Sequence, residues 1–290
     1  MTWTLTADLD DYLAVAGGFL RSRPVHNTIQ LVALDSLEVR GPSAFGNVAP
    51  LFGWWRSGAG PVIAALLHTP PFPVLLTRLP ADPAGDPAGE LAEMLASRGR
   101  RLPGVNAEQG DAEAFAAAWS GLTGAAWREF RRSRLFRLEQ LTPPDPSPPG
   151  AARVATAADR GLLESWLAAF RQELADLGGP GAGMIEDRIG HGGLTLWEAG
   201  GAPVSLAGCT RPVEGVVRIG PVYTPPEHRG RGYGGAVTTG VSQAALEAGA
   251  AYVVLFTDLA NPTSNALYQR LGYRPIEDRL VLKFEAQRPS

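Results

Sequence analysis

The chain has 290 residues, of which 45% are hydrophobic and 19% are charged, and its formal net charge is -3 at pH 7. These values are typical of a globular protein long enough for two domains of ordinary size. The charge divides evenly, with 13 basic and 15 acidic residues up to Gly150 and 13 and 14 after it. Because neither half carries a basic excess, we expect no nucleic-acid partner.

The start of the chain and its apolar stretches bear on where the protein works. The first 25 residues carry acidic side chains where a secretory signal has a basic region, so we expect no export. The most apolar stretch, residues 60–76, is interrupted by His68 and prolines and is too short to span a membrane. The sequence therefore predicts a cytoplasmic protein. Cys209 is the only cysteine, so we expect neither a disulfide within the chain nor a cysteine-based metal site.

The predicted elements of the first half alternate between helix and strand. A helical pattern at 12–20 is followed by two strands and a glycine turn at 55–66 and by a strand at 74–79. Two helices and a final strand are expected at 90–99, 112–122 and 134–140.

The second half repeats this order. Its elements are a helix at 162–177, a hairpin at 197–208, a strand at 216–223, a helix at 236–249, a strand at 251–258, a helix at 263–273 and a strand at 279–285. The two hairpins also share a pattern, since Trp55 and Trp197 are each followed by Gly after three residues and by Pro-Val after six. We interpret the chain as a duplicated α/β domain; the alternative is a chance similarity of two unrelated α/β domains.

A proline-rich segment, "LTPPDPSPPGAAR" at 141–153, separates the two halves. Five prolines exclude a helix or a central strand there, so the segment is expected to be extended. We therefore predict a first domain at 1–140, a linker at 141–150 and a second domain at 151–290.

The stretch "YTPPEHRGRGYGGAV" (223–237) places four glycines within six residues. Gly230, Gly232 and Gly235 match G-x-G-x-x-G, and Asp258 could serve as the ribose acid of a dinucleotide fold. The surrounding sequence argues against a dinucleotide-binding fold, because six residues separate the strand from the first glycine and only 32 residues follow Asp258. A nucleotide P-loop is excluded, since no Gly-Lys-Ser/Thr occurs.

Two interpretations of this loop remain. A connector without a ligand would leave Arg229 and Arg231 unexplained. A phosphate site explains them, because glycines at the start of a helix let several backbone N–H groups converge where the helix dipole favours negative charge. Arg229 would add guanidinium donors to phosphate oxygens.

The motif R-x-x-G-x-G at 229–234 resembles the acyl-CoA-binding motif of the GNAT superfamily of N-acetyltransferases. The downstream "NPTSNALYQRLGY" (261–273) is similar to the second motif of that superfamily. The resemblance covers 190–285, extends to 151–189 by element order, and reaches 1–140 only through the internal repeat. The chain resembles tandem members whose N-terminal copy has lost the cofactor motif.

This resemblance implies an α/β (α+β) fold with two GNAT-like domains. Each would contain a mixed, mostly antiparallel central sheet with a splayed strand pair, flanked by helices. It also implies acetyl-CoA (coenzyme A) as co-substrate and no metal. The residues that would contact acetyl-CoA are Val222, Tyr223, Thr224, Arg229, Gly230, Arg231, Gly232, Tyr233, Gly234, Asn261, Ser264 and Tyr268.

The resemblance also assigns catalytic roles. The amide of Val222 would stabilise the oxyanion that forms when a neutral amine attacks the thioester, and Tyr268 would protonate the departing thiolate. The alternative for Tyr268 is a packed residue with its hydroxyl satisfied, and for Asn261 a purely helix-capping role.

A general base is not evident. Strand 216–223 has no carboxylate, which departs from family members that place a glutamate there. Glu173 is the preferred candidate because the first helices of this fold border the acceptor cleft, and Asp176, Glu186 and Glu214 remain alternatives. Each of these carboxylates could equally be an ordinary solvated surface group.

The sequence thus predicts an acetyl-CoA-dependent N-acetyltransferase that acts on a primary amine of a small molecule or peptide, with no membrane partner. The alternative is a non-catalytic regulatory or interaction protein that binds acyl-CoA. Retention of Tyr268 and Asn261 favours catalysis, whereas the missing base favours the alternative.

Overall fold

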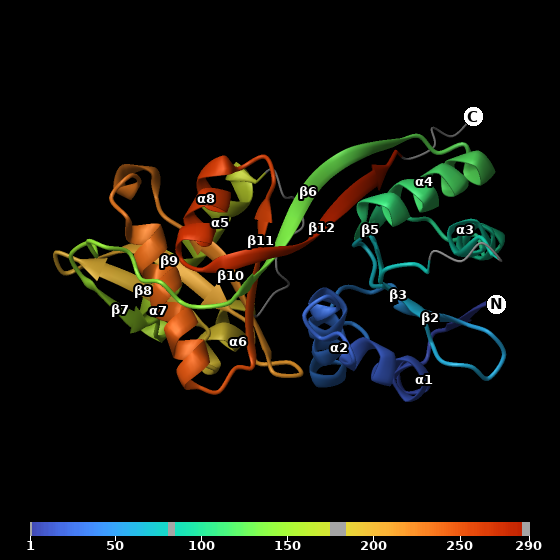
Figure 1. The fold of residues 1–290 in the computed structure, drawn as a ribbon, viewed down its shortest axis with the longest axis horizontal. Coiled ribbons are helices and arrows are strands. Elements are labelled where there is room, and N and C mark those ends of the chain that lie inside the picture. The colour runs from blue at the N-terminus through green and yellow to red at the C-terminus, as the bar shows by residue number, and fades with distance from the viewer. Residues whose placement is uncertain (1, 81–84, 175–183, 286–290) are drawn as a thin grey trace. The chain divides into compact units, whose positions relative to one another are not determined.

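The computed structural model describes residues 2–80, 85–174 and 184–285 (Figure 1). Contacts divide the chain into two compact units, one of Met1–Arg134 with Glu277–Ser290 and the other of Leu135–Ile276. Two long strands, β6 (Trp127–Leu138) and β12 (Tyr273–Phe284), contribute to both units.

These boundaries differ from the predicted ones. The proline-rich segment 141–150 lies inside the second unit, where Trp197 Nε1 donates a hydrogen bond to the carbonyl of Pro149 (3.1 Å). The end of β12 pairs with β5 (Gly104–Glu108) of the first unit, with Leu280 opposite Ala107 and Leu282 opposite Val105. Proline content shows where regular structure is interrupted, but it does not show which distant strand completes a sheet.

The first unit contains a sheet in the order β1-β2-β3-β4-β5-β12. Neighbouring strands from β1 to β4 are antiparallel, β4 and β5 are parallel, and β5 and β12 are antiparallel. The remaining elements are β1 (Thr2–Thr6), α1 (Leu9–Arg21), α2 (Thr28–Arg40), β2 (Leu51–Arg56), β3 (Ala64–His68), β4 (Val74–Leu76), α3 (Pro87–Ser97) and α4 (Gln109–Thr123).

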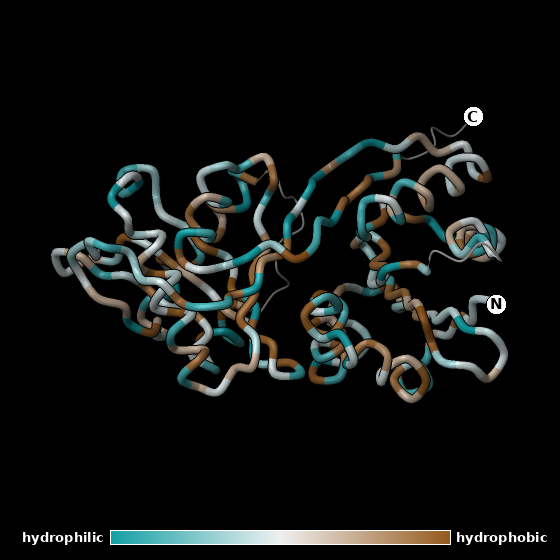
Figure 2. Tube along the Cα trace, in the orientation of Figure 1, coloured by the Kyte–Doolittle hydropathy of each residue, from teal (hydrophilic) through white to brown (hydrophobic). Residues whose placement is uncertain are grey.

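Local sequence explains several boundaries in this unit. Helix α1 begins where the Asp8 carboxylate accepts a hydrogen bond from the amide of Asp11 (3.0 Å), and Asp86 caps α3 in the same way. Helix α4 ends at Gly124, whose φ of 70° is left-handed. Apolar side chains are concentrated along β2 and β3 (Figure 2), where Trp55 and Leu66 are fully buried.

The second unit repeats this pattern. Its five strands run in the order β7-β8-β9-β10-β11, with β6 beside β11, and only the step from β10 to β11 among these five is parallel. Its elements are β7 (Ala151–Val154), η1 (Ala157–Asp159), α5 (Arg160–Glu173), α6 (Met184–Gly190), β8 (Leu194–Ala199), β9 (Ala202–Cys209), β10 (Val216–Tyr223), η2 (Pro226–His228), α7 (Tyr233–Glu247), β11 (Tyr252–Asp258) and α8 (Pro262–Arg270).

Five consecutive strands therefore have the same pairing pattern in both units, as duplication predicts. The helices also correspond. Helices α1 and α5 follow the first strand of their units. Helices α3 and α7 come before the strand that pairs in parallel, β5 or β11, and helices α4 and α8 come after it. Helix α2 was not expected from the sequence, because its apolar residues spread around the helix rather than along one face.

Strand β10 separates from β11 halfway along its length. The two pair from Val216 with Tyr252 up to Ile219 with Leu255 and no further. Beyond a register shift, β10 remains paired with β9 through Val222 opposite Ala207. The predicted splayed pair is therefore present in the second unit.

The sheet of the second unit has a core on each face. Side chains of α7, including Val237 and Val241, pack with Val217 and Ile219 on one face. Leu163 and Leu167 of α5 pack with Leu206 on the other. No helix in the described part of the chain is both long and apolar enough to cross a membrane.

Candidate active site

The glycine-rich loop connects the free end of β10 to the start of α7. Gly230 and Gly232 adopt φ angles of 75° and 83°, which favour glycine because a Cβ strains this region. Gly232 is the N-cap of α7, and its carbonyl accepts the hydrogen bond from Ala236 (3.1 Å). The amides of residues 233–235 consequently have no acceptor within the helix.

A left-handed backbone does not explain the glycine at position 234. Its backbone is helical, and a Cβ built on it would lie 3.4 Å from Thr224 Oγ1, an ordinary contact. Neither its backbone conformation nor its protein neighbours therefore require glycine. The predicted reason, close approach of a phosphate group, stays a prediction.

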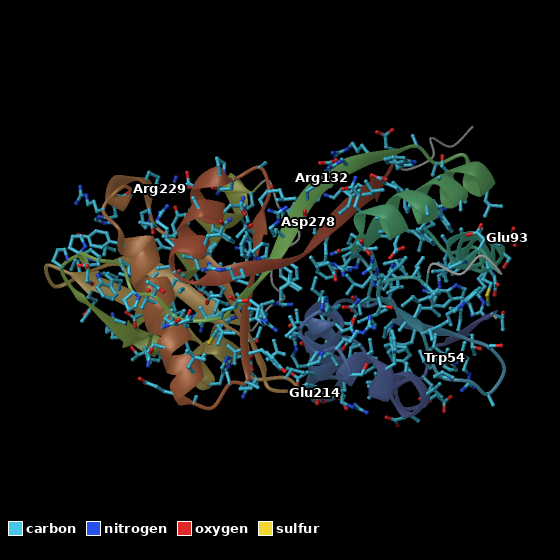
Figure 3. The ribbon with its side chains drawn as sticks, in the orientation of Figure 1. Trp54, Glu93, Arg132, Glu214, Arg229 and Asp278 are labelled. Atoms are coloured by element: carbon cyan, nitrogen blue, oxygen red, sulfur yellow. The ribbon has the colours of Figure 1, made fainter. Side chains whose placement is uncertain are left out.

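Arg229, which is labelled in Figure 3, forms an ion pair with Glu173 beside this loop. Arg229 Nη2 donates to both carboxylate oxygens of Glu173, at 2.6 and 2.8 Å, and Nε donates to the carbonyl of Thr224 at 2.8 Å. The structure thus brings together the arginine predicted to bind phosphate and the preferred base candidate. Both side chains are nearly half exposed, so the pair contributes only ~0–1 kcal/mol to stability.

Tyr223 links the loop to α5. Its ring makes edge contacts with Trp166 and Phe170, at centroid distances of 6.2 Å, and the Arg229 guanidinium lies 5.8 Å from it. Burial and the negative charge of Glu173 raise the pKa of the Tyr223 hydroxyl. Sequence reasoning assigned Tyr223 only through its position in the motif, and it missed the aromatic wall that α5 supplies.

Ser205 of β9 holds the end of β10 in place. Its hydroxyl donates to the carbonyl of Tyr223 (3.1 Å) and lies 2.8 Å from the Thr224 hydroxyl. Ser205 is fully buried, and sequence reasoning did not single it out. A serine within an otherwise apolar strand was the available signal.

Tyr268 lies on α8 in the same apolar cluster that Val222 borders. It is 8% exposed, and its ring meets Tyr273 edge-on at 6.0 Å. Burial raises the pKa of Tyr268 to about 12, so the phenol stays protonated near neutral pH. The hydroxyl makes no hydrogen bond to another described residue, and it is therefore available as a donor to a bound group.

The start of α8 confirms the predicted cap. The Asn261 side chain accepts a hydrogen bond from the amide of Ser264 (3.0 Å). Asn265, which sequence reasoning missed, donates to the carbonyls of Asp258 and Asn261 at 3.0 and 2.8 Å. It also bonds with the Thr257 hydroxyl, and so it ties α8 to the end of β11.

Two arginines lie near the middle of β10. Arg188 of α6 donates from Nη1 to the carbonyl of Gly220 (2.6 Å), and burial lowers the pKa of its guanidinium. Burial, and then the charge of Arg188, lower the pKa of Arg218 to about 10. Arg218 forms no ion pair with a described residue, whereas the Asp187 carboxylate partly offsets the charge of Arg188.

The other predicted base candidates lie elsewhere. Glu186 pairs with Arg160 (2.5 Å), and Glu214 lies in the turn before β10, at the end opposite Arg229 (Figure 3). Asp176 is outside the described residues. Among the candidates the structure describes, Glu173 alone is paired with a predicted site residue. No cluster of metal-ligating side chains occurs in the described ranges.

Comparisons with known proteins agree with this geometry. Residues 155–273 match the Acetyltransferase (GNAT) family. A search of curated proteins found no match. A Drosophila protein solved by a structural genomics consortium superimposes with a TM-score of 0.68 and 14% identity, covering 98% of each chain.

Two further solved structures are GNAT proteins. A GNAT-family acetyltransferase from Colwellia psychrerythraea gives a TM-score of 0.56 at 12% identity, covering 99% of this chain and 100% of that one. A tandem GNAT protein from the clavulanic acid biosynthesis pathway gives 0.56 at 19% identity, covering 99% of each. Residues 155–273 therefore match the GNAT acetyltransferase family, and the whole chain has the fold of GNAT proteins.

Proposed function

We propose that this protein transfers an acetyl group from acetyl-CoA to a primary amine of a small molecule or peptide, and that the second unit carries out the reaction. The observation that carries the proposal is the separation of β10 from β11 after Ile219, immediately before the glycine-rich loop. This arrangement offers an unpaired strand edge and an anion site at a helix N-terminus in one continuous segment.

The residues present fit the cofactor. Amides of residues 229–234 would hold the pyrophosphate, and the exposed Arg229 and Arg231 would neutralise its charge. The backbone from Val222 to Thr224 would pair with the pantetheine arm, while Asn261 and Ser264 at the start of α8 would border it. Arg229 must exchange its contacts with Glu173 and the Thr224 carbonyl for phosphate oxygens.

Acetyl-CoA supplies an activated thioester whose thiolate leaves readily. The Val222 amide donates to the carbonyl oxygen as the amine nitrogen bonds to the carbonyl carbon. Tyr268 then donates a hydrogen bond to the sulfur as the carbon–sulfur bond breaks. Because the pKa of Tyr268 is about 12 and that of a thiol is ~8.5, complete proton transfer is uphill, so Tyr268 acts mainly by hydrogen bonding.

Glu173 accepts the proton that the ammonium form of the acceptor must lose before attack, and the second proton of the attacking nitrogen passes to the departing thiolate. Its carboxylate becomes available when Arg229 turns to the phosphate, which links deprotonation of the acceptor to cofactor binding. The aromatic wall of Trp166, Phe170 and Tyr223 holds Glu173 beside the end of β10.

The acceptor also carries a carboxylate in this proposal. Val217 and Ile219 face α7, so Arg218 between them faces the other side of the sheet, from which Arg188 of α6 contacts β10. A partly buried cation without a carboxylate partner is costly, and an anionic substrate group would compensate it. An amino acid or a peptide C-terminus has this chemistry.

Binding of acetyl-CoA by calorimetry tests the cofactor site. Gly234→Trp fills the predicted phosphate position without straining the backbone, and Gly18→Trp adds the same side chain at an open position of α1. We expect the first variant to lose binding and the second to retain it. Equal affinity in both would contradict the proposed site.

Thiol release in the presence of amines tests turnover. Binding without release from any amine would favour the non-catalytic alternative, to which the engagement of Glu173 by Arg229 lends some support.

A further inference from the structure

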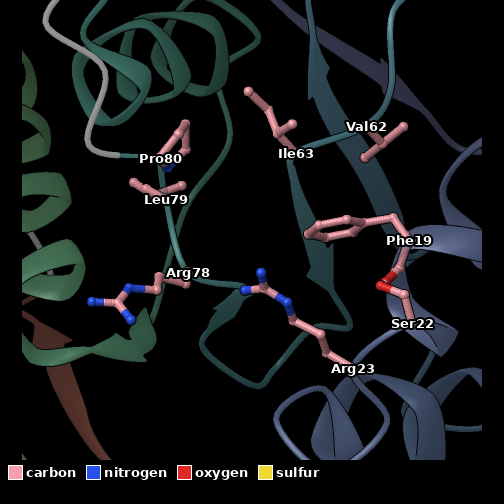
Figure 4. A pocket seen from close by; sticks show the side chains of 8 residues that line it. All are labelled: Phe19, Ser22, Arg23, Val62, Ile63, Arg78, Leu79 and Pro80. Carbon is pink, nitrogen blue, oxygen red and sulfur yellow. The ribbon is translucent and has the colours of Figure 1, made fainter.

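The first unit contains a pocket of about 520 Å³ that the reaction proposed above does not use. The end of α1, the turn before β3 and the segment after β4 line it (Figure 4). Phe19, Ile63 and Leu79 supply apolar surface, and Arg23 and Arg78 supply the charged side chains. Pockets of this size commonly hold small organic ligands.

Internal duplication gives this pocket a counterpart. Trp55 pairs with Ala64 and Trp197 pairs with Ser205, so Ala65 corresponds to Leu206. The amide of Thr77 donates to the carbonyl of Ala65 (3.0 Å), and Tyr223 is the residue opposite Leu206. Thr77 therefore corresponds to Tyr223 and Arg78 to Thr224, so the pocket lies where the segment after β10 begins in the other unit.

Two arginines line this pocket. Arg78 stands at the position of Thr224, and Arg23 lies just after α1. Arg78 Nε is paired with Glu108 at 3.1 Å. The Arg23 guanidinium extends between Phe19 and Arg78 into the pocket (Figure 4), and it makes no hydrogen bond or ion pair with a described residue. The pocket thus offers one uncompensated cation beside apolar walls.

Coenzyme A does not fit this unit. Arg279 of β12 is 3% exposed and donates from Nη2 to the carbonyls of Leu76 and Asn106, at 2.9 and 3.0 Å. Its guanidinium therefore bridges β4 and β5 where β10 and β11 separate in the other unit. The segment after β4 also lacks clustered glycines, so no phosphate cradle accompanies the pocket.

We propose that the first unit binds a small carboxylate with an apolar body in this pocket. The carboxylate would form two hydrogen bonds with the Arg23 guanidinium, whose planar fork suits this geometry. The apolar body would contact Phe19, Ile63 and Leu79. The nearby acids are already engaged, because Glu108 is paired with Arg78 and Asp111 accepts a hydrogen bond from the Leu79 amide (2.9 Å).

Octanoate is a suitable probe, and 1-octanol is its uncharged control. In the full-length protein with labelled methyl groups, octanoate should shift the NMR signal of the Ile63 methyl group in a saturable way. Arg23→Gln should weaken this binding by about 10- to 100-fold, the size expected for loss of a hydrogen bond to a charged group. Arg98→Gln, at another exposed arginine of the same unit, should leave it unchanged.

Three results would overturn the proposal. The first is an Ile63 signal that octanoate does not move, and the second is an octanoate affinity that Arg23→Gln does not change. The third is equal affinity for 1-octanol and octanoate, which would mean that the pocket accepts apolar chains without using Arg23. None of these measurements depends on acetyl transfer, so they test the pocket independently of the second unit.

Discussion

Arg229 and Glu173 are joined by two hydrogen bonds, from Nη2 of the arginine to both oxygens of the carboxylate. The sequence assigned these residues to phosphate binding and to proton removal, two roles with opposite charge requirements. Their contact neutralises both charges within the site. A pyrophosphate can displace an exposed carboxylate because it presents more negative charge to the arginine.

We expect Glu173→Gln to separate the two roles. Loss of the ion pair should change acetyl-CoA affinity by no more than about fivefold, because an exposed pair is worth only ~0–1 kcal/mol. Loss of a general base should lower kcat by about 100-fold or more. Glu164→Gln, at an exposed glutamate of the same helix, is the matched control for steady-state kinetics and calorimetry. Unchanged kcat in Glu173→Gln would remove Glu173 from the reaction.

Tyr268→Phe should lower kcat by about 100-fold, near the lower limit for a positioned acid, and leave acetyl-CoA affinity unchanged. The hydroxyl is the only group lost, and it makes no hydrogen bond to a described residue. Steady-state kinetics and calorimetry on the same preparation distinguish the two effects. Wild-type turnover in the variant would assign Tyr268 to packing with Tyr273 alone.

The same variant should change the alkaline stability of the protein. The pKa of Tyr268 is about 12 when folded and ~10 when unfolded, so the unfolded chain loses its proton first as pH rises. The free energy of unfolding should therefore fall from about pH 10 to pH 12, and this group contributes up to ~1.4 kcal/mol per pH unit. Denaturant unfolding should show a shallower decline in Tyr268→Phe than in wild type; equal slopes would contradict the buried hydroxyl.

A carboxylate on the acceptor substrate should raise the kcat/KM of its acetylation. If Arg188 and Arg218 receive a carboxylate, an amino acid should be acetylated with a higher kcat/KM than its carboxamide, by about 10- to 100-fold. Arg218→Gln should remove this preference while leaving acetyl-CoA affinity intact. Competition between each acid and its amide measures the ratio directly. A preference for the amide, or none, would leave the two arginines with a structural role.

Asn265→Ala should destabilise the second unit by about 1–3 kcal/mol, because it leaves the carbonyls of Asp258 and Asn261 without a donor. Gln269→Ala, on the exposed side of α8, should have little effect. Hydrogen exchange of the α8 amides locates the change. Equal melting temperatures in the two variants would show that the Asn265 network is not needed to hold α8.

A fragment of residues 1–140 should fail to fold on its own. It lacks the half of β12 that pairs with β5, including the buried Leu280 and Leu282, and it lacks Arg279. A chain in which residues 277–285 are joined to this fragment by a flexible linker should recover dispersed amide NMR signals. A well-folded 1–140 fragment would restore the boundary expected from the prolines.

The sequence by itself determined most of the second unit. The glycine-rich loop and the Asn-Pro cap of α8 are local signals, because backbone conformation and capping depend on residues near one another in the chain. The duplicated hairpins were also readable, since Trp, Gly and Pro-Val recur at the same spacing. The loop and the α8 motif carried the resemblance to GNAT proteins, and that resemblance implied the splayed strand.

Only the tertiary structure decided which distant residues meet. Glu173 and Arg229 lie 56 positions apart, and Arg279 bridges strands more than 170 positions earlier in the chain. Such contacts depend on how strands pair and helices pack. The residues next to a charged side chain in the sequence do not show which distant residue it will contact. For the same reason, the sequence placed the domain boundary at the prolines, whereas the pairing of β12 with β5 determines which residues complete the first unit.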